Sequence, residues 1–231
     1  MNNTCYKYLI LDFGNVLFYP QTGNWFITEK FLDLIDTTKI PWQCFNAAVS
    51  KYNYVLSRKA TTLEDEYKIF FEFYRNVLTE INYKVSNDTI NELSLDFTYN
   101  FDKYSIYSDV LENLIELASQ YKLILLSDNW PCGEYIMKYY HLEKYFLKMY
   151  ISSYYGCLKK DGVFFDYPIN EFGIKPGEAL FIDDNEENLD MAIKKKLDVM
   201  IMMRDQIKES KYPIICHLYI DNILVKKKKM L

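Results

Sequence analysis

Acidic and hydroxyl side chains recur at the ends of three short apolar segments of this sequence. Asp12 ends the first segment, Ser127 and Asp128 end the second, and Asp183 and Asp184 end the third. Short apolar runs bounded by turn residues are typical of strands that are buried in a parallel sheet. Because the carboxyl ends of parallel strands share one edge, where open α/β sheets bind their ligands, we expect these side chains to converge.

Side chains of these types could transfer a phosphoryl group through a covalent intermediate. A carboxylate such as Asp12 can act as the nucleophile, and a carboxylate pair such as Asp183 and Asp184 can hold a hard divalent cation. Lys159 lies a few residues beyond a fourth expected strand and could bring its ammonium group to the same edge. With the Ser127 hydroxyl, it would stabilise the charge on the phosphoryl oxygens.

The elements that position these residues alternate between strand and helix patterns. Strands are expected at 7–11, 122–126, 149–151, 179–182 and 199–203, and helices at 108–118, 134–145, 167–172 and 187–196. Alternation of this kind predicts an α/β fold, with a parallel sheet covered by helices on both faces.

Residues 18–105 differ from this pattern, because they carry helical spacing and no convincing strand. Apolar side chains fall on one face at 25–35 and again at 67–78. Thr61 and Glu64 have the spacing of a capping box at the start of a helix. We therefore predict an all-helical insertion at 18–105, between two parts of one core at 1–17 and 106–231. Its aromatic residues are expected in the core of that insertion, although four of them could instead line a substrate pocket: Trp25, Trp42, Tyr52 and Tyr54.

In this order and spacing, the four polar segments resemble the motifs of the haloacid dehalogenase (HAD)-like superfamily of hydrolases. The corresponding segments are 12–17, 125–128, 152–159 and 181–188, and the resemblance extends over about 6–204. It implies a Rossmann-like core whose helical insertion is a C1-type cap that closes over the site and selects substrates. The Asp-x-Gly-Asn-Val form of the first motif resembles a bacterial branch that includes sugar-phosphate phosphatases.

The resemblance also implies a role for each matching residue. Asp12 would be the nucleophile and a Mg²⁺ ligand, and Gly14 would offer its backbone carbonyl to the same ion. Asp184 would complete the metal site, and Asp183 would be either a second ligand or an orienting partner. The implied catalytic residues are Asp12, Ser127 and Lys159, and the implied substrate-binding residues are Ser127, Asp128 and Lys159.

Gly14 is the main departure from the pattern of the family. Most family phosphatases have an aspartate there, which protonates the leaving group, and such general acid help typically contributes about 10²–10⁴ in rate. An acid from the cap, a metal-bound water, or a good leaving group such as an anomeric or acyl phosphate could compensate. Asp128 and Lys160 also depart from the common asparagine and proline. Asp128 adds negative charge near an anionic substrate, and Lys160 could offset it.

We therefore expect a Mg²⁺-dependent phosphatase that hydrolyses a small phosphorylated metabolite, such as a sugar phosphate. Two alternatives stay open because of Gly14, and Asp128 also favours the second of them. One is a haloacid dehalogenase, in which a carboxylate displaces halide from carbon without a metal. The other is a catalytically weakened HAD-like protein with a binding or regulatory role.

Composition limits the partners and the location that we expect. The formal net charge of −5 disfavours nucleic acid as a partner, and we expect the basic run Lys226–Lys229 to be a solvated tail. No apolar segment has the length of a membrane span, and no signal peptide is recognisable. The five cysteines are scattered without a paired spacing, which is typical of reduced thiols in a cytoplasmic protein. We expect a monomer or a homodimer.

Overall fold

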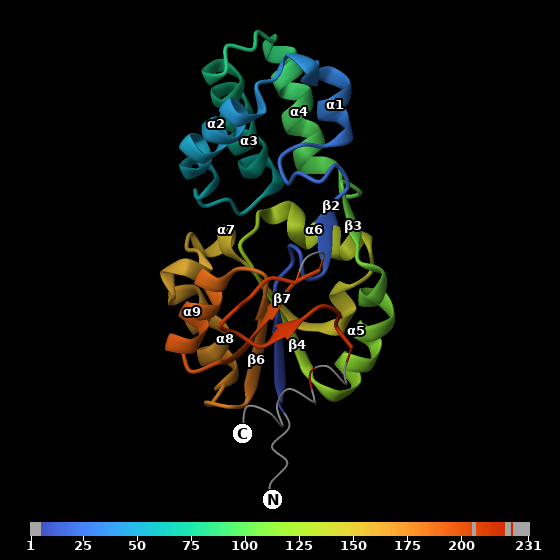
Figure 1. The fold of residues 1–231 in the computed structure, drawn as a ribbon, viewed down its shortest axis with the longest axis vertical. Coiled ribbons are helices and arrows are strands. Elements are labelled where there is room, and N and C mark those ends of the chain that lie inside the picture. The colour runs from blue at the N-terminus through green and yellow to red at the C-terminus, as the bar shows by residue number, and fades with distance from the viewer. Residues whose placement is uncertain (1–5, 205–206, 220–222, 224–231) are drawn as a thin grey trace, which may run out of the picture.

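A six-stranded sheet forms the centre of the computed structural model, which describes residues 6–204, 207–219 and 223 (Figure 1). The strand order is β5-β4-β1-β6-β7-β8, and every neighbouring pair is parallel. The strands are β1 (Tyr8–Leu11), β4 (Lys122–Ser127), β5 (Phe146–Ile151), β6 (Ala179–Asp183), β7 (Asp198–Met202) and β8 (Ile214–Ile215). The predicted parallel α/β sheet is confirmed, with β8 as an additional edge strand that is too short to show a pattern.

Helices cover both faces of this sheet, as predicted. Side chains of a strand alternate between the two faces, and here they enter two separate hydrophobic clusters. Leu9 and Leu11 pack with α5 (Ser108–Gln120) and α6 (Pro131–Tyr139). Ile10 packs with α8 (Val163–Phe172) and α9 (Glu186–Lys194) on the opposite face, and Figure 1 shows these pairs on opposite sides.

Two helices have other bounds than the sequence predicted. The helix expected at 134–145 ends at Tyr139, because His141 takes a left-handed backbone (φ 56°) and a 3-10 turn, Glu143–Tyr145, follows. The helix expected at 167–172 begins at Val163, directly after Gly162, whose φ is also positive.

Four helices form a second, separately packed unit, which we call the helical block. They are α1 (Glu29–Leu34), α2 (Trp42–Leu56), α3 (Leu63–Glu80) and α4 (Asn87–Tyr99). Their buried side chains make one hydrophobic cluster of their own, in which Phe70 stacks on Phe97 with ring centroids 3.8 Å apart. The block therefore has its own core and sits above the sheet in Figure 1.

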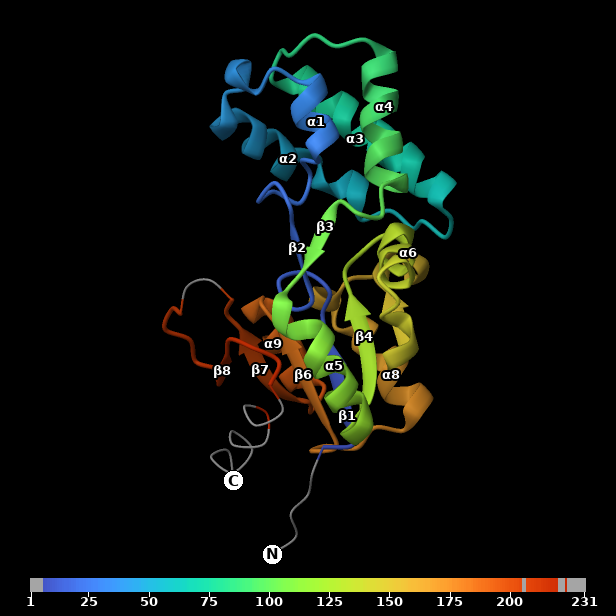
Figure 2. The same cartoon turned by 90° about the vertical axis from the view of Figure 1, so that its right-hand side faces the viewer.

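A two-stranded ribbon joins the helical block to the sheet, and the prediction of no strand within 18–105 is wrong at both ends. The strands β2 (Phe18–Pro20) and β3 (Tyr104–Ile106) pair antiparallel. Figure 2 shows them running between the two parts of the molecule. Three-residue strands are too short to show a period of two in the sequence.

The starts of two helices in the block also differ from expectation. The α1 helix begins only at Glu29, because the Thr28 hydroxyl caps it by accepting a hydrogen bond from the Phe31 amide. The residues 25–27 that were expected in this helix precede it. The capping box of α3 consists of Thr62 and Asp65 rather than Thr61 and Glu64, since the helix begins one residue later than predicted.

Two further expectations concern the membrane and the thiols. None of the helices in the described ranges is both long and apolar enough to cross a bilayer. The four described cysteines, Cys44, Cys132, Cys157 and Cys216, are free thiols. Cys5 and the basic run Lys226–Lys229 lie outside the described residues.

Candidate active site

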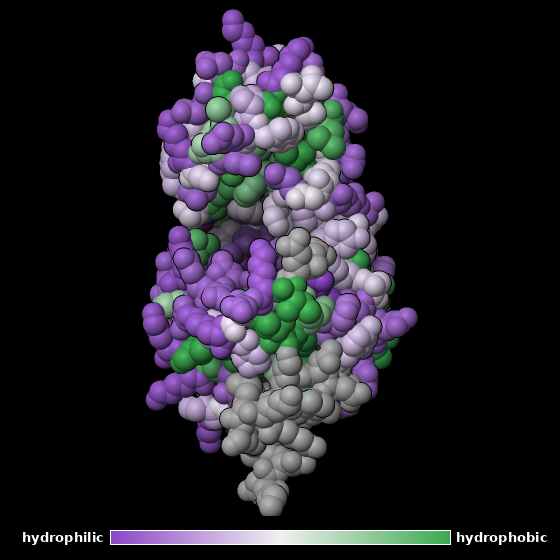
Figure 3. Space-filling model, in the orientation of Figure 1, coloured by the Kyte–Doolittle hydropathy of each residue, from purple (hydrophilic) through white to green (hydrophobic). Residues whose placement is uncertain are grey.

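The carboxyl ends of β1, β4 and β6 meet below the helical block and open into a cavity of about 280 Å³. The surface in Figure 3 is hollowed at this level, between the block and the sheet. Parallel pairing of β1 with both β4 and β6 places the residues that follow these strands side by side. The polar side chains that line the cavity are Asp12, Asn15, Ser127, Asp128, Asn129 and Asp184.

Lys159 reaches this sheet edge from a 3-10 turn and is almost fully buried, with 1% of its side chain exposed. Its ammonium lies 2.8 Å from Asp12 Oδ1 and donates a 2.6 Å hydrogen bond to Asp183 Oδ2. Burial opposes the charge, but the carboxylates of Asp12 and Asp183 outweigh it and hold the pKa of Lys159 above its ordinary value. Lys159 is therefore a fixed cation against Asp12.

Asp183 is fully buried, and hydrogen bonds occupy both of its carboxylate oxygens. Oδ2 accepts from Lys159, and Oδ1 accepts from the Asn185 amide at 2.8 Å. The Asn188 side-chain amide lies 3.2 Å from both oxygens. These hydrogen bonds fix the position of the Asp183 carboxylate against the Lys159 ammonium.

Asp184 is half-buried and faces the cavity beside Asp12. Its Oδ2 accepts a 2.7 Å hydrogen bond from the Asn15 side chain, whose backbone is left-handed at φ 52°. Asparagine tolerates this conformation better than most residues. Burial raises the pKa of Asp184, and the hydrogen bond from Asn15 opposes the rise. The helix α9 is capped by the Asn185 side chain, so the Asp184 carboxylate is not used as a helix cap.

Asp12, Asp183 and Asp184 form the cluster that suits a cation. Each offers one carboxylate oxygen, and these oxygens lie within 4.8 Å of one another. When all three carboxylates are ionised, the ammonium of Lys159 balances one of them and two negative charges remain, a state that a bound cation would stabilise. Burial raises the pKa of Asp12, Lys159 opposes this, and the two neighbouring aspartates raise it further. Oxygen ligands and a surplus of two negative charges fit Mg²⁺, and Gly14 also lines the cavity.

The remaining predicted residues lie around this cluster. Ser127 ends β4 and is buried, with 2% exposure, where it lines the cavity. Asp128 is exposed, and its Oδ1 accepts a 2.9 Å hydrogen bond from the Lys159 amide, so it helps to position that lysine. Lys160 is exposed and lines a neighbouring cavity of about 390 Å³, which also includes Asp128.

Other residues of the site were not predicted. Asn15 and Asn188 stand within the motif segments 12–17 and 181–188, and that position was the available signal for them. The sequence carried no comparable signal for Trp130, whose indole nitrogen donates a 3.0 Å hydrogen bond to Leu56 O of the helical block.

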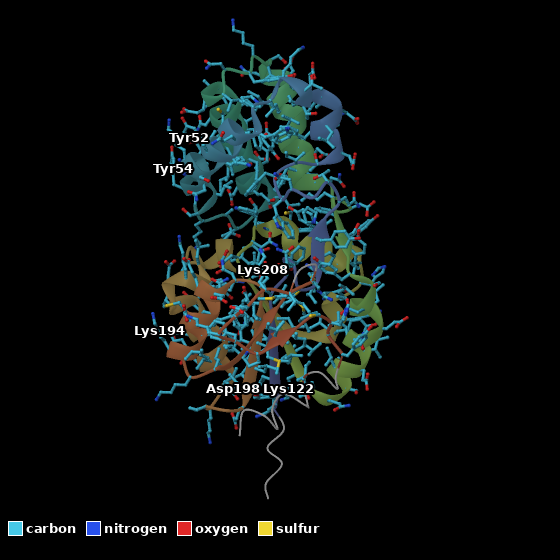
Figure 4. The ribbon with its side chains drawn as sticks, in the orientation of Figure 1. Tyr52, Tyr54, Lys122, Lys194, Asp198 and Lys208 are labelled. Atoms are coloured by element: carbon cyan, nitrogen blue, oxygen red, sulfur yellow. The ribbon has the colours of Figure 1, made fainter. Side chains whose placement is uncertain are left out.

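Of the four aromatic residues considered for a pocket, two line cavities. Trp25 lines the cavity at Asp12, and Tyr54 lines the neighbouring cavity. Trp42 and Tyr52 are in neither lining, and the Tyr52 hydroxyl bonds Glu80 instead. Figure 4 shows Tyr52 and Tyr54 at the outer edge of the helical block.

Known structures share this fold over nearly the whole chain. A HAD family enzyme of Bacteroides thetaiotaomicron, in complex with magnesium and inorganic phosphate, has a TM-score of 0.62 and 20% identity, covering 88% of this chain and 97% of its own. The L-2-haloacid dehalogenase of Xanthobacter autotrophicus, with chloropropionic acid covalently bound, has a TM-score of 0.66 and 14% identity, covering 96% and 99%. The 2-haloacid dehalogenase of Pseudomonas syringae pv. Tomato DC3000 has a TM-score of 0.64 and 13% identity, covering 97% and 100%.

Sequence comparison is consistent with this likeness. No individually curated protein matches the chain. The family model of haloacid dehalogenase-like hydrolases matches residues 6–194, which is most of the sequence. The chain therefore belongs to the haloacid dehalogenase-like hydrolases and is an enzyme of that family.

Proposed function

We propose that this enzyme is a Mg²⁺-dependent phosphatase that hydrolyses a small phosphorylated metabolite through an aspartyl-phosphate on Asp12. The observation that carries the proposal is the buried ion pair of Asp12 and Lys159, beside a carboxylate cluster and a cavity lined by Ser127. A nucleophilic carboxylate, a fixed cation, a hydroxyl and a metal-binding group are what phosphoryl transfer of this type requires.

The side chains of the site divide the steps of this mechanism among them. A carboxylate oxygen of Asp12 attacks the phosphorus, and the bond to the leaving-group oxygen breaks with its electron pair. The Lys159 ammonium and the Ser127 hydroxyl hold the phosphoryl oxygens and stabilise their charge. Water then attacks the phosphorus, which releases inorganic phosphate and restores the Asp12 carboxylate.

The cation would be held by Asp12 and Asp184, with the backbone carbonyl of Gly14 as a further ligand. When bound, Mg²⁺ supplies positive charge next to the phosphoryl oxygens. Asp183 serves as the orienting partner of the lysine, since its oxygens already accept hydrogen bonds. Asn15, through its bond to Asp184, supports the metal site from outside.

We further propose that residues 18–105 act as a C1-type cap on a core formed by 1–17 and 106–231. The hydrogen bond from Trp130 to Leu56 O ties the end of α2 to the loop after β4, directly beside the cavity. A cap held there would exclude water from the reacting groups and contribute side chains that select the substrate.

Haloacid dehalogenation is the second candidate, and the aromatic lining of the cavity favours it. Trp25, Phe26, Tyr104 and Trp130 give one side of the cavity a largely apolar surface, which would suit a small halogenated carbon chain. The surplus negative charge of the carboxylate cluster argues against it, because a haloacid substrate is itself a carboxylate.

The two candidates differ in their metal requirement and in their product. The test is to measure phosphate release from sugar, acyl and aryl phosphates, and halide release from 2-chloropropionate, with Mg²⁺ and with EDTA. Wild type and Asp12→Asn are compared after both are shown to be folded. Phosphate release that requires Mg²⁺ and is lost in Asp12→Asn supports the phosphatase. Halide release that is unaffected by EDTA would contradict the phosphatase and support the dehalogenase.

A further inference from the structure

The indole of Trp25 crowds the position that a side chain at residue 14 would take. A Cβ atom on Gly14 would lie 3.2 Å and 3.3 Å from Cζ2 and Cη2 of Trp25, which is closer than ordinary van der Waals contact. Trp25 belongs to the segment between β2 and α1 and packs against the hydrophobic cluster of the sheet, whereas Gly14 follows β1. A side chain at position 14 would therefore press on the Trp25 ring, which would have to shift by a few tenths of an ångström to admit it.

Trp25 is held in this position by Tyr104 of β3. The two rings meet edge to face, with centroids 5.0 Å apart, and the Tyr104 hydroxyl donates a 3.3 Å hydrogen bond to the Trp25 carbonyl. Tyr104 itself is buried, with 4% exposure. The hydroxyl of Tyr104 is thus engaged in positioning Trp25, and the ring of Trp25 has a fixed orientation against Gly14.

Two more rings extend this surface along the same cavity. Phe26 and Trp130 line it together with Trp25 and Tyr104. Trp130 is fixed by its hydrogen bond to Leu56 O, and its ring meets Phe26 edge to face at 6.5 Å. We call Trp25, Phe26, Tyr104 and Trp130 the aromatic wall.

We infer that the aromatic wall is the leaving-group subsite and that the preferred substrates are aryl phosphates, with Trp25 as the residue that determines this specificity. The inference rests on the proposed phosphatase function. An in-line displacement at phosphorus places the leaving group on the side away from Asp12. The aromatic wall lines the same cavity as Asp12, so a flat aromatic leaving group in that cavity can contact its rings.

The chemistry of the leaving group explains how the enzyme functions without an acid at position 14. The bond between phosphorus and the phenolic oxygen breaks with its electron pair on that oxygen, while the bond from Asp12 to phosphorus forms. A phenol has a pKa of about 10, well below the roughly 15.7 of water, so a phenolate can depart without receiving a proton. Water then hydrolyses the aspartyl-phosphate, and its proton neutralises the phenolate in solution.

The inference is tested with phenyl phosphate, glycerol 2-phosphate and acetyl phosphate as substrates. Acetyl phosphate reports the aspartyl-phosphate chemistry with no ring in the leaving group. Trp25→Leu should lower the ratio of kcat/KM for phenyl phosphate to that for acetyl phosphate roughly two- to tenfold, the value of one aromatic contact. Trp25→Phe should restore most of the ratio. Trp42→Leu is the matched control, because Trp42 is an exposed tryptophan of the same block.

A measurement on the wild type guards against variants that do not fold. Phenol should inhibit acetyl phosphate hydrolysis at a concentration several-fold lower than cyclohexanol, which has a ring of similar size without a flat face. The aromatic subsite is overturned by equal inhibition by the two alcohols, by an unchanged ratio in Trp25→Leu, or by equal use of glycerol 2-phosphate and phenyl phosphate. In each of these cases, turnover of acetyl phosphate would still support the phosphatase. No phosphate release from any substrate would overturn both.

Discussion

Lys159 and Asp183 form an ion pair of 2.6 Å in which both side chains are almost completely buried. Asn188 bonds the same carboxylate, so the position of Asp183 in the pair is fixed by a second residue. Desolvation of two charges is costly, and removal of one partner leaves the other buried without compensation. The pair therefore serves to hold the ammonium against Asp12, and the fold depends on keeping both members.

Lys159→Met should abolish phosphate release and lower the free energy of unfolding by about 3–5 kcal/mol, because it leaves Asp12 and Asp183 buried beside each other without a cation. Urea unfolding in EDTA, together with a phosphate-release assay, checks both effects. Lys160→Met is the control, since this neighbouring lysine is exposed and should change stability by no more than about 0.5 kcal/mol. Equal effects of the two variants would contradict the assignment of the buried cation to Lys159.

Asn15→Gly should weaken Mg²⁺ binding while it leaves the backbone unstrained. The change removes the 2.7 Å hydrogen bond to Asp184, and glycine adopts a φ of 52° readily. Loss of such an outer partner typically costs about 10- to 100-fold in metal affinity. The Mg²⁺ concentration for half-maximal activity is the measurement, with calorimetric titration as a second readout.

Asn82→Gly provides the control for this experiment. Asn82 is also left-handed, with φ 56°, but it is an exposed residue of the helical block. It should leave the Mg²⁺ requirement unchanged. If both variants weaken Mg²⁺ binding equally, the effect comes from a general loss of rigidity and not from the support of Asp184.

The convergence of the polar residues was predictable from the sequence because it depends only on the ends of the strands. Once β1, β4 and β6 are parallel neighbours, Asp12, Ser127 and Asp184 must follow at one edge. Lys159 was less constrained, since it comes from a 3-10 turn whose position depends on packing. Lys159 was nevertheless expected at this edge, because it follows the end of β5 by only a few residues.

The aromatic side of the cavity could not be predicted in the same way. Trp25 was expected in a helix, but it precedes the cap of α1 at Thr28 and owes its position to the ribbon of β2 and β3. Contacts between the helical block and the sheet join residues that are far apart in sequence, such as Trp130 and Leu56. No local periodicity records such contacts, so they emerge only from the folded structure.

Glu66 of α3 should make stability fall as the pH rises toward neutrality. Its side chain is fully buried, Oε2 accepts a 2.7 Å hydrogen bond from the Cys132 amide, and Oε1 has no hydrogen-bond partner among the described residues. Burial raises the pKa of Glu66 to about 7, and the charge of Lys103 opposes the rise. In the unfolded chain the pKa is ordinary, so between about 4.5 and 7 only the folded state keeps the proton.

The stabilising proton is therefore progressively lost as the pH approaches 7, and Glu66→Gln should remove this dependence. Between pH 6 and pH 8.5 the wild type should lose about 1.4 kcal/mol relative to the variant, the value of the single pH unit below the folded pKa. Urea unfolding at these two pH values, both above the isoelectric point of about 5.2, measures this difference in stability. Glu64 is exposed on the same helix, so the stability of Glu64→Gln should change with pH as that of the wild type does. If the stability of Glu66→Gln also follows that of the wild type between pH 6 and pH 8.5, Glu66 is charged over this whole range.

Gly14→Asp alone should fail to create an efficient phosphatase for alkyl esters, although it supplies the carboxyl group that this position lacks. Its Cβ would lie 3.2 Å from the Trp25 ring, which Tyr104 holds in place. We expect the crowding by this ring to keep the new carboxyl from a productive position. Thermal unfolding of this variant should show a loss of stability relative to the wild type.

Removal of the ring should change that result. In Gly14→Asp/Trp25→Ala the carboxyl has room to donate a proton, and kcat/KM for glycerol 2-phosphate should rise by up to about 10²-fold over Trp25→Ala, the lower end of what general acid help contributes. The preference for phenyl phosphate should fall in the same variant, because the stacking surface is gone. An equal gain in Gly14→Asp alone would mean that Trp25 does not occupy the place of the acid. The two substitutions together therefore test whether Trp25 and an acid at position 14 exclude each other.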